Sequence, residues 1–281
     1  MVGAAGPATA DGFQVTETDE EIRIETPQIE AVVRKTGYVS GVARQSFLDK
    51  QSGFRDPGFG LDIADWIMEP GSDASYRDNL VPELVYEFGN AYHGNRAKRS
   101  IEGPQICTRA RRLQPTVIRG DDFVAVRQRF QYTLAAPGKK AGSTWTQLIV
   151  FPAGKRYFVS MDRIDTVNDS DGMFLRIDMP GHIRHKQGGT FAEIYLSYLG
   201  GPDGLRIPSS AFCENFAPDA KYEYFRGEHP VPDRFIRACR LRDPDTGRLG
   251  PWLAGMTLDP DVVYDAWCHQ RPGLRTCACD A

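Results

Sequence analysis

Two arginines and a glutamine occupy alternate positions in the segment 123–133, whose apolar content is typical of a β-strand. Side chains alternate across a strand, so one face would carry these polar groups and the other would be apolar. A guanidinium is planar and can hold a carboxylate through two parallel hydrogen bonds. The pattern predicts either a solvent-facing side of a sheet or the floor of a groove that binds carboxylates and hydroxyls. The polar residues are Arg127, Arg129 and Gln131; the apolar ones are Val124, Val126, Phe130 and Tyr132.

Two predicted loops carry groups that could transfer protons. Imidazole titrates near neutral pH and is a common general acid or base, although either loop could also be an ordinary solvated turn. The first loop holds Tyr92, His93, Lys98, Arg99 and Gln105, and the second holds His182, Arg184 and His185. We predict catalytic roles for His93, Tyr92, His182 and Arg127. The other five loop residues, with Arg129 and Gln131, are predicted to bind substrate.

An indole lies beside polar side chains in the segment 264–271. The indole of tryptophan combines a large apolar ring, which suits contact with the apolar faces of sugars, with an N–H group that can donate a hydrogen bond. Trp267 is therefore a further predicted substrate-binding residue, with a place in the core as the alternative.

The six cysteines do not have the spacing of a paired framework. Cys268, Cys277 and Cys279 lie close to His269, and thiolates and imidazole are zinc ligands, but Cys-x-Cys differs from the usual Cys-x2-Cys pattern. We predict no cofactor and leave a calcium or zinc ion open. The bland alternative is one or two buried thiols followed by a poorly packed tail beyond Arg271.

Composition excludes several classes of function. With 34 Lys and Arg against 37 Asp and Glu, the formal charge of −3 gives no reason to expect nucleic acid as a partner. No apolar run approaches the roughly 18 residues of a membrane helix, so no membrane partner is predicted. The sequence given has no signal-peptide pattern, and the compartment stays unknown. A mature chain would favour an extracellular or periplasmic location. Motifs of nucleotide-binding proteins, serine hydrolases and zinc proteases are absent from the sequence.

The elements that must position these residues are almost all strands. About a dozen alternating or apolar segments are separated by turns rich in the 28 Gly and 19 Pro. The hairpin over Ser143–Asn168 is predicted to be central, and Asp259 and Pro260 predict the start of a two-turn helix. We predict an all-β fold, a large antiparallel β-sandwich with one or two short helices. Residues 1–12 would be a flexible leader and 13–281 a single domain.

Two stretches carry a resemblance to a known superfamily. ETPQIEAVVRKTGYVSGVARQSFLDKQSG resembles the opening strands of galactose-mutarotase-like β-supersandwich domains, and TQLIVFPAGKRYFVSMDRIDTVND is similar to their long central strands. The resemblance implies a supersandwich and carbohydrate chemistry of the polysaccharide-lyase kind. Aldose-epimerase active-site motifs are absent, which argues against simple mutarotation.

These observations together predict a carbohydrate-active enzyme for an acidic, uronate-containing glycan and favour a lyase that works by β-elimination. Such a reaction needs a group that neutralises the carboxylate, a base for the C5 proton and an acid for the leaving oxygen. A glycoside hydrolase is the first alternative and needs two carboxyls at one site. Its candidate carboxylates are Asp62, Asp65, Glu87 and Glu102. A non-catalytic carbohydrate-binding sandwich is the second alternative.

Overall fold

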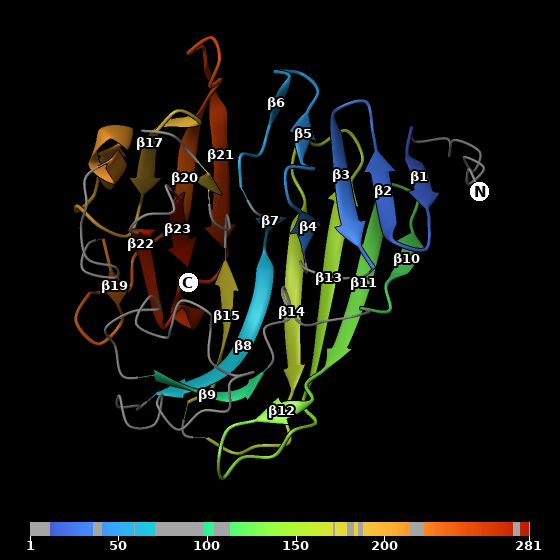
Figure 1. Ribbon diagram of the computed structural model, residues 1–281, viewed down its shortest axis with the longest axis vertical. Helices are drawn as coiled ribbons and strands as arrows, with labels where there is room; N and C mark the ends of the chain where they lie inside the picture. The colour runs from blue at the N-terminus through green and yellow to red at the C-terminus, as the bar shows by residue number, and fades with distance from the viewer. Residues whose placement is uncertain are drawn as a thin grey trace.

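The structure is a computed structural model. It describes residues 12–35, 41–58, 60–70, 98–103, 113–170, 172–178, 183–184, 188–213, 222–271 and 276–280. Throughout these ranges the chain is built from antiparallel strands and two short 3₁₀ turns, which confirms the predicted all-β sandwich (Figure 1). No helix in this part of the chain is long and apolar enough to cross a membrane.

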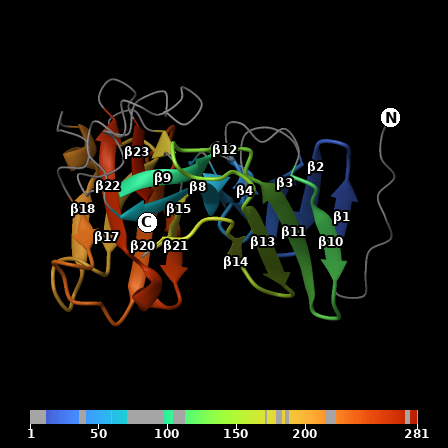
Figure 2. The same ribbon diagram turned by 90° about the horizontal axis from the view of Figure 1, so that it is seen from below.

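The first half is a sandwich of two sheets that form separate layers (Figures 1 and 2). Its core combines Ile22, Ile24 and Val33 from one sheet with Ile149 and Phe151 from the other. All five side chains are almost completely buried, which drives the two sheets together. One sheet has the order β1 (Gln14–Glu17), β2 (Glu21–Glu25), β3 (Ile29–Arg34), β5 (Leu48–Asp49) and β6 (Phe54–Arg55). The other has the order β10 (Thr116–Arg119), β11 (Phe123–Gln131), β13 (Thr144–Pro152) and β14 (Val159–Asp165).

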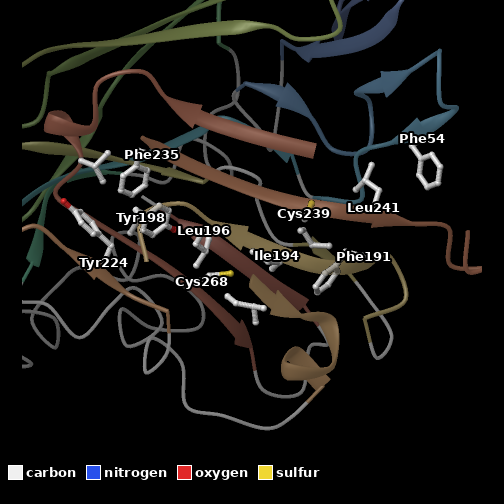
Figure 3. Close-up of a cluster of buried hydrophobic side chains, with 14 residues drawn as sticks. Phe54, Phe191, Ile194, Leu196, Tyr198, Tyr224, Phe235, Cys239, Leu241 and Cys268 are labelled. Atoms are coloured by element: carbon white, nitrogen blue, oxygen red, sulfur yellow. The ribbon is translucent and has the colours of Figure 1, made fainter. Parts of the chain in front are cut away.

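The second half packs a four-stranded sheet against part of an eight-stranded sheet. Its core is aromatic, with the rings of Tyr198 and Phe235 stacked at 4.0 Å and Tyr224 edge-on to both (Figure 3). The four-stranded order is β18 (Leu205–Pro208), β17 (Phe191–Leu196), β20 (Phe235–Arg242) and β21 (Leu249–Thr257). The larger sheet has the order β12 (Leu134–Ala135), β9 (Lys98–Gly103), β8 (Ile63–Pro70), β15 (Phe174–Asp178), β23 (Thr276–Asp280), β22 (Asp265–Arg271) and β19 (Tyr224–Phe225), with β16 (Ile183–Arg184) on β23.

Apolar contacts join the two halves. Leu253 of β21 packs against the cores of both, and a third cluster places Ile67 of β8 and Ile101 of β9 with Trp145 of β13. β8 crosses the middle of the molecule between the two halves (Figure 1). Residues near the start of β8 therefore lie where both halves meet.

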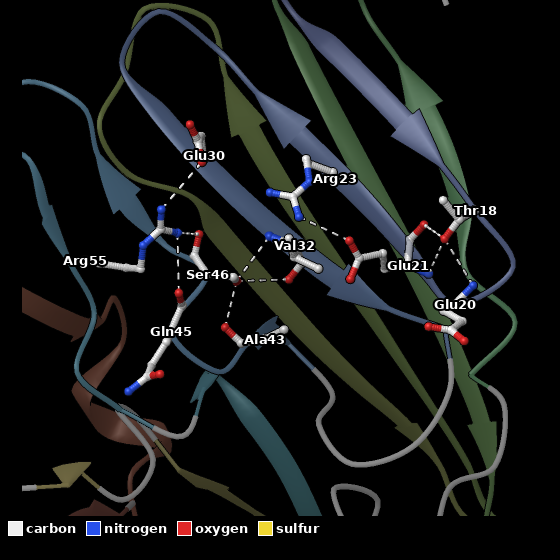
Figure 4. Close-up of polar contacts among 10 residues, drawn as sticks. All are labelled: Thr18, Glu20, Glu21, Arg23, Glu30, Val32, Ala43, Gln45, Ser46 and Arg55. Carbon is white, nitrogen blue, oxygen red and sulfur yellow. Dashed lines mark hydrogen bonds and ion pairs between the residues drawn. The ribbon is translucent and has the colours of Figure 1, made fainter. Parts of the chain in front are cut away.

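The segment that leads to the centre is fixed by a set of polar contacts (Figure 4). The Ser46 hydroxyl donates to the Ala43 carbonyl at 2.7 Å and accepts from the Val32 N–H at 3.2 Å. The short ladder of β4 (Val42–Ala43) with β7 (Gly60–Leu61) follows Gly41. Gly41 has φ +65°, and a Cβ there would come within 2.2 Å of the Leu61 carbonyl oxygen, so only glycine fits.

The structure corrects three expectations about local elements. The helix predicted after Asp259 is one 3₁₀ turn, η4 (Pro260–Val262), because strand β22 starts at Asp265; Asp259 does cap it. The other 3₁₀ turn is η3 (Ser209–Cys213).

The tail forms β23, paired with β22, although its sequence has no apolar period, because backbone hydrogen bonds need none. In the central hairpin, β13 is internal to its sheet but β14 is an edge strand in the part described.

Candidate functional site

The predicted polar face of β11 exists. Arg127, Arg129 and Gln131 are exposed, whereas Val124 and Val126 are buried against the first core. The sheet therefore turns its cations outward, as the alternation of residue types predicted.

A hollow of about 810 Å³ opens over this face. It is floored by register neighbours: Arg129 of β11 lies opposite Thr146 of β13, and Thr146 lies opposite Arg163 of β14. In the adjoining row, Arg127 lies opposite Thr116 of β10. We call this hollow the cationic groove; its lining is Glu17, Lys35, Gln114, Pro115, Thr116, Arg127, Arg129, Thr146, Arg163 and Asp165.

Charge in the cationic groove is only partly neutralised. Lys35 pairs with Glu17, and Arg163 pairs with Asp165 through an N–O distance of 2.6 Å. Within the described ranges, neither Arg127 nor Arg129 has an ion pair. Four cations thus face two carboxylates, and two guanidinium forks stay available for an anionic ligand.

The floor differs from the prediction in one respect. The Gln131 side chain shares the exposed face, but it donates to the Gly142 carbonyl at 3.2 Å and is not among the groove-lining residues. The side chains beside the arginines are instead Thr146 and Arg163, which the sequence reasoning did not single out.

Most of the predicted loop residues cannot be placed against the groove. Tyr92, His93, Gln105, His182 and His185 lie outside the described residues. The backbones of four others are placed, without their side chains: Lys98 and Arg99 in β9, Arg184 in β16 and Trp267 in β22. Convergence of His93 and His182 on Arg127 stays a prediction.

A second polar cluster, missed at the sequence level, occupies the inner face of the same sheet. Gln128, Gln147 and Asp162 are register neighbours on β11, β13 and β14 and form what we call the inner row. The Gln147 amide nitrogen donates to Asp62 Oδ2 at 2.9 Å and to the Asp62 carbonyl at 3.1 Å, while its oxygen accepts from Gly41 N–H at 3.0 Å. Both glutamines are completely buried, and among the described residues neither side-chain amide atom of Gln128 has a hydrogen-bond partner.

Two carboxyls of this cluster have raised pKa values: Asp62 is 2% exposed, and Asp162 is partly buried. Burial raises the pKa of Asp62, against hydrogen bonds from Ser160 and Gln147 and the charge of Arg237. Burial and then the charge of Asp62 raise the pKa of Asp162 well above its ordinary value, although Trp145 Nε1 donates to it at 2.7 Å. Like charges in a desolvated site favour retention of a proton by the pair.

Of the four carboxylates predicted for a hydrolase, the structure describes the side chains of two, Asp62 and Glu102. Glu102 is completely buried, and its carboxylate accepts from the Gly142 and Ser143 N–H groups at 2.8 and 3.0 Å and from the Asn168 amide at 3.0 Å, so its role is structural. Glu87 and the Asp65 side chain lie outside what is described. Asp62 does meet a second carboxyl, Asp162, but on the face opposite to the cationic groove.

The cysteines also differ from the expectation. Cys268 is disulfide-bonded, and Cys239 is a buried free thiol whose pKa burial raises to about 12. The Cys268 sulfur is therefore not available as a thiolate ligand for zinc. Elsewhere in the described ranges, no three His, Cys, Asp or Glu side chains come together in a way that could hold a metal ion.

Comparisons with known proteins add no family. A scan against protein-family models finds no match, and a search of curated proteins finds none either. The resemblance to galactose-mutarotase-like domains therefore stays a prediction from the sequence.

Proposed function

We propose that this protein acts on an acidic, uronate-containing glycan and cleaves it by β-elimination. The observation that carries the proposal is the pair Arg127 and Arg129, two exposed guanidinium groups without a carboxylate partner in the described structure, side by side in a hollow of about 810 Å³. Planar forks on a rigid strand suit carboxylates of a sugar chain.

The chemistry of elimination makes use of such a pair. Removal of the C5 proton of a uronate builds negative charge on its carboxylate, so a fixed cation stabilises the transition state more than the ground state. Arg127 and Arg129 would take this role. The proton carriers predicted from the sequence are His93, His182 and Tyr92.

The residues that line the cationic groove bear on the two alternative functions, hydrolysis and binding without catalysis. Its described lining has no imidazole and no phenol, which favours binding without catalysis as the second candidate. Hydrolysis has the carboxyl pair Asp62 and Asp162, but Asp62 is only 2% exposed and lies behind the sheet. A sugar in the groove would meet neither carboxyl.

The test mixes the protein with a panel of polyuronates and follows the absorbance of unsaturated uronyl ends. We expect product from the wild type, loss of both binding and turnover in Arg127→Ala and Arg129→Ala, and normal activity in Arg119→Ala. Arg119 is a matched control because it is exposed on β10 of the same sheet but does not line the groove. If a catalytic imidazole is involved, its removal lowers turnover by about 10²–10⁴-fold.

Three other results would each replace the proposal. Reducing ends without unsaturation would mean hydrolysis. Binding with neither product would mean a carbohydrate-binding module. Absence of binding to every acidic glycan would exclude the whole class.

A further inference from the structure

The arginines of the cationic groove are arranged in two directions. Arg127 and Arg129 are two residues apart on β11, so their Cα atoms are about 7 Å apart along the strand. Arg129 and Arg163 are separated by one intervening strand, so their Cα atoms are about 10 Å apart across the sheet. Arg129 thus stands at the corner of an L of three guanidinium groups.

The arm across the strands has a middle position suited to a sugar ring. Thr146 lies between Arg129 and Arg163, is partly exposed and offers a hydroxyl. Beside this arm, in the next row, Leu148 and Met161 present apolar surface, and Met161 is 56% exposed. Neither residue lines the cationic groove, but both adjoin it on the same face of the sheet. A pyranose ring, with hydroxyls at its edge and C–H groups on its faces, matches the Thr146 hydroxyl and this adjoining apolar surface.

Arg163 is available in spite of its pairing with Asp165. The Arg163 and Asp165 side chains are 76% and 54% exposed, and an ion pair so open to water contributes little to stability. A ligand carboxylate can therefore compete for this guanidinium. Lys35, by contrast, is 9% exposed and already paired with Glu17, which leaves it less free to turn toward a ligand.

We propose that Arg129 and Arg163 hold two different carboxylates of one glycan chain that crosses the strands over Thr146. This inference rests on the proposed function and narrows its substrate class to oligo- and polyuronates with at least two carboxylates, with Arg163 as the residue that selects for length. A single uronate can occupy only one end of the arm.

The test measures the binding of mono-, di-, tri- and tetrauronates by calorimetry at one fixed ionic strength, because exposed charges are screened by salt. For the wild type we expect a step of about tenfold or more in affinity at the first length that spans both arginines, since the second contact becomes intramolecular. Arg163→Ala should abolish this step, so that every length binds with about the affinity of the monouronate, which itself falls by no more than about twofold because Arg129 still holds one carboxylate. Arg119→Ala should behave as the wild type.

A double-mutant cycle distinguishes a shared ligand from two independent sites. Arg129→Ala, Arg163→Ala and the double variant are compared on the shortest spanning oligomer and on the monouronate. A shared ligand predicts that either single substitution lowers the affinity for the oligomer by about tenfold or more, whereas two independent sites predict a loss of no more than about twofold for either substitution on either ligand. Melting curves of all variants report whether each still folds.

The outcomes separate this inference from the proposed function. If Arg163→Ala weakens every length equally, or if affinity does not rise with length, the two-carboxylate inference is wrong while acidic-glycan binding stands. If no acidic glycan binds or is cleaved, the proposed function fails first. If single-stranded nucleic acid binds at the same arginines more tightly than any polyuronate, the ligand class itself is wrong.

Discussion

The two faces of β11, β13 and β14 carry polar rows that differ by one residue on each strand. The outer row is Arg129, Thr146 and Arg163; the inner row is Gln128, Gln147 and Asp162. The backbone is shared, so only the direction of the side chains separates them. The outer row faces a groove in water, and the two glutamines of the inner row are completely buried.

Burial decides what each row can do. A buried amide or carboxyl without a partner costs about 1–3 kcal/mol, a cost that Gln128 bears within the described structure and Gln147 avoids. Gln147 accordingly joins the Gly41 segment and the Asp62 turn to β13. Exposed guanidinium groups are hydrated at little cost, so Arg129 can stay unpaired within the described structure and Arg163 keeps only an exposed ion pair, which leaves both available to a ligand. We infer that the inner row fixes the sheet against the segments of Gly41 and Asp62, and that the outer row, held on the same strands, binds the ligand.

The largest loss of stability should come from the substitution Gln147→Leu. This change removes the acceptor for Gly41 N–H and the donor to Asp62, and both lost partners are buried. We expect the free energy of unfolding to fall by about 3 kcal/mol or more, measured by urea titration. Thr146→Val, the neighbouring residue with its side chain outward, should cost less than about 0.5 kcal/mol. Equal losses in the two variants would contradict the division between the rows.

The free energy of unfolding should also depend on pH through the protonation of Asp62 and Asp162, and we expect this effect to be smaller than that of Gln147→Leu. Their native pKa values are raised, so the native state keeps protons that the unfolded chain releases above about pH 4. Their contribution is fully present below that pH and is lost as pH rises through the native values. Wild-type stability should therefore decline with pH over this window. Asp56, whose pKa burial raises to about 6, adds to the decline in the same direction.

The variant Asp162→Asn measures how much of this pH dependence of stability comes from the Asp62–Asp162 pair. The amide keeps an oxygen to accept from Trp145 Nε1 and removes one of two like charges in a desolvated site. We expect the variant to be more stable than the wild type at pH 8, by about 1 kcal/mol, and to show a flatter decline. Unfolding titrations from pH 4 to pH 8 check this. A variant that is less stable at every pH would show that the Asp162 carboxyl makes contacts that an amide cannot replace, and that repulsion within the pair is a minor effect.

The sequence predicts the outer face far better than the inner one. Alternation of arginine with apolar residues is enough to assign Arg127 and Arg129 to one side of β11. Gln147 also falls on its correct face by alternation, beside Trp145 and Ile149, but a lone glutamine there carries no sign of its partners. Asp62 is 85 residues away along the chain, and only the tertiary packing of β8 against β13 brings it near.

Other differences have the same origin in long-range pairing. The tail becomes β23 because β22 offers it a ladder, which its composition does not predict. Glu102 looks like a possible catalytic carboxylate until the Gly142 turn and Asn168 enclose it. Groove neighbours across strands, Thr146 and Arg163, depend on register, which no local pattern provides.

The smallest effect on stability should come from the outer row itself. Arg129→Gln removes one of four cations in the groove and breaks no ion pair within the described structure. We expect the free energy of unfolding to change by less than about 0.5 kcal/mol, and any change to be a gain at low salt, because repulsion with Arg127 and Arg163 is relieved. The gain should disappear at high salt as screening grows. Urea titrations at two salt concentrations measure this, with Arg119→Gln as the control outside the groove. A loss above about 1 kcal/mol at both concentrations would mean that Arg129 supports the fold, and the reason to assign the unpaired charge to a ligand would be gone. A neutral or stabilising result would show that the fold does not need this charge, which is what a residue kept for an anionic partner requires.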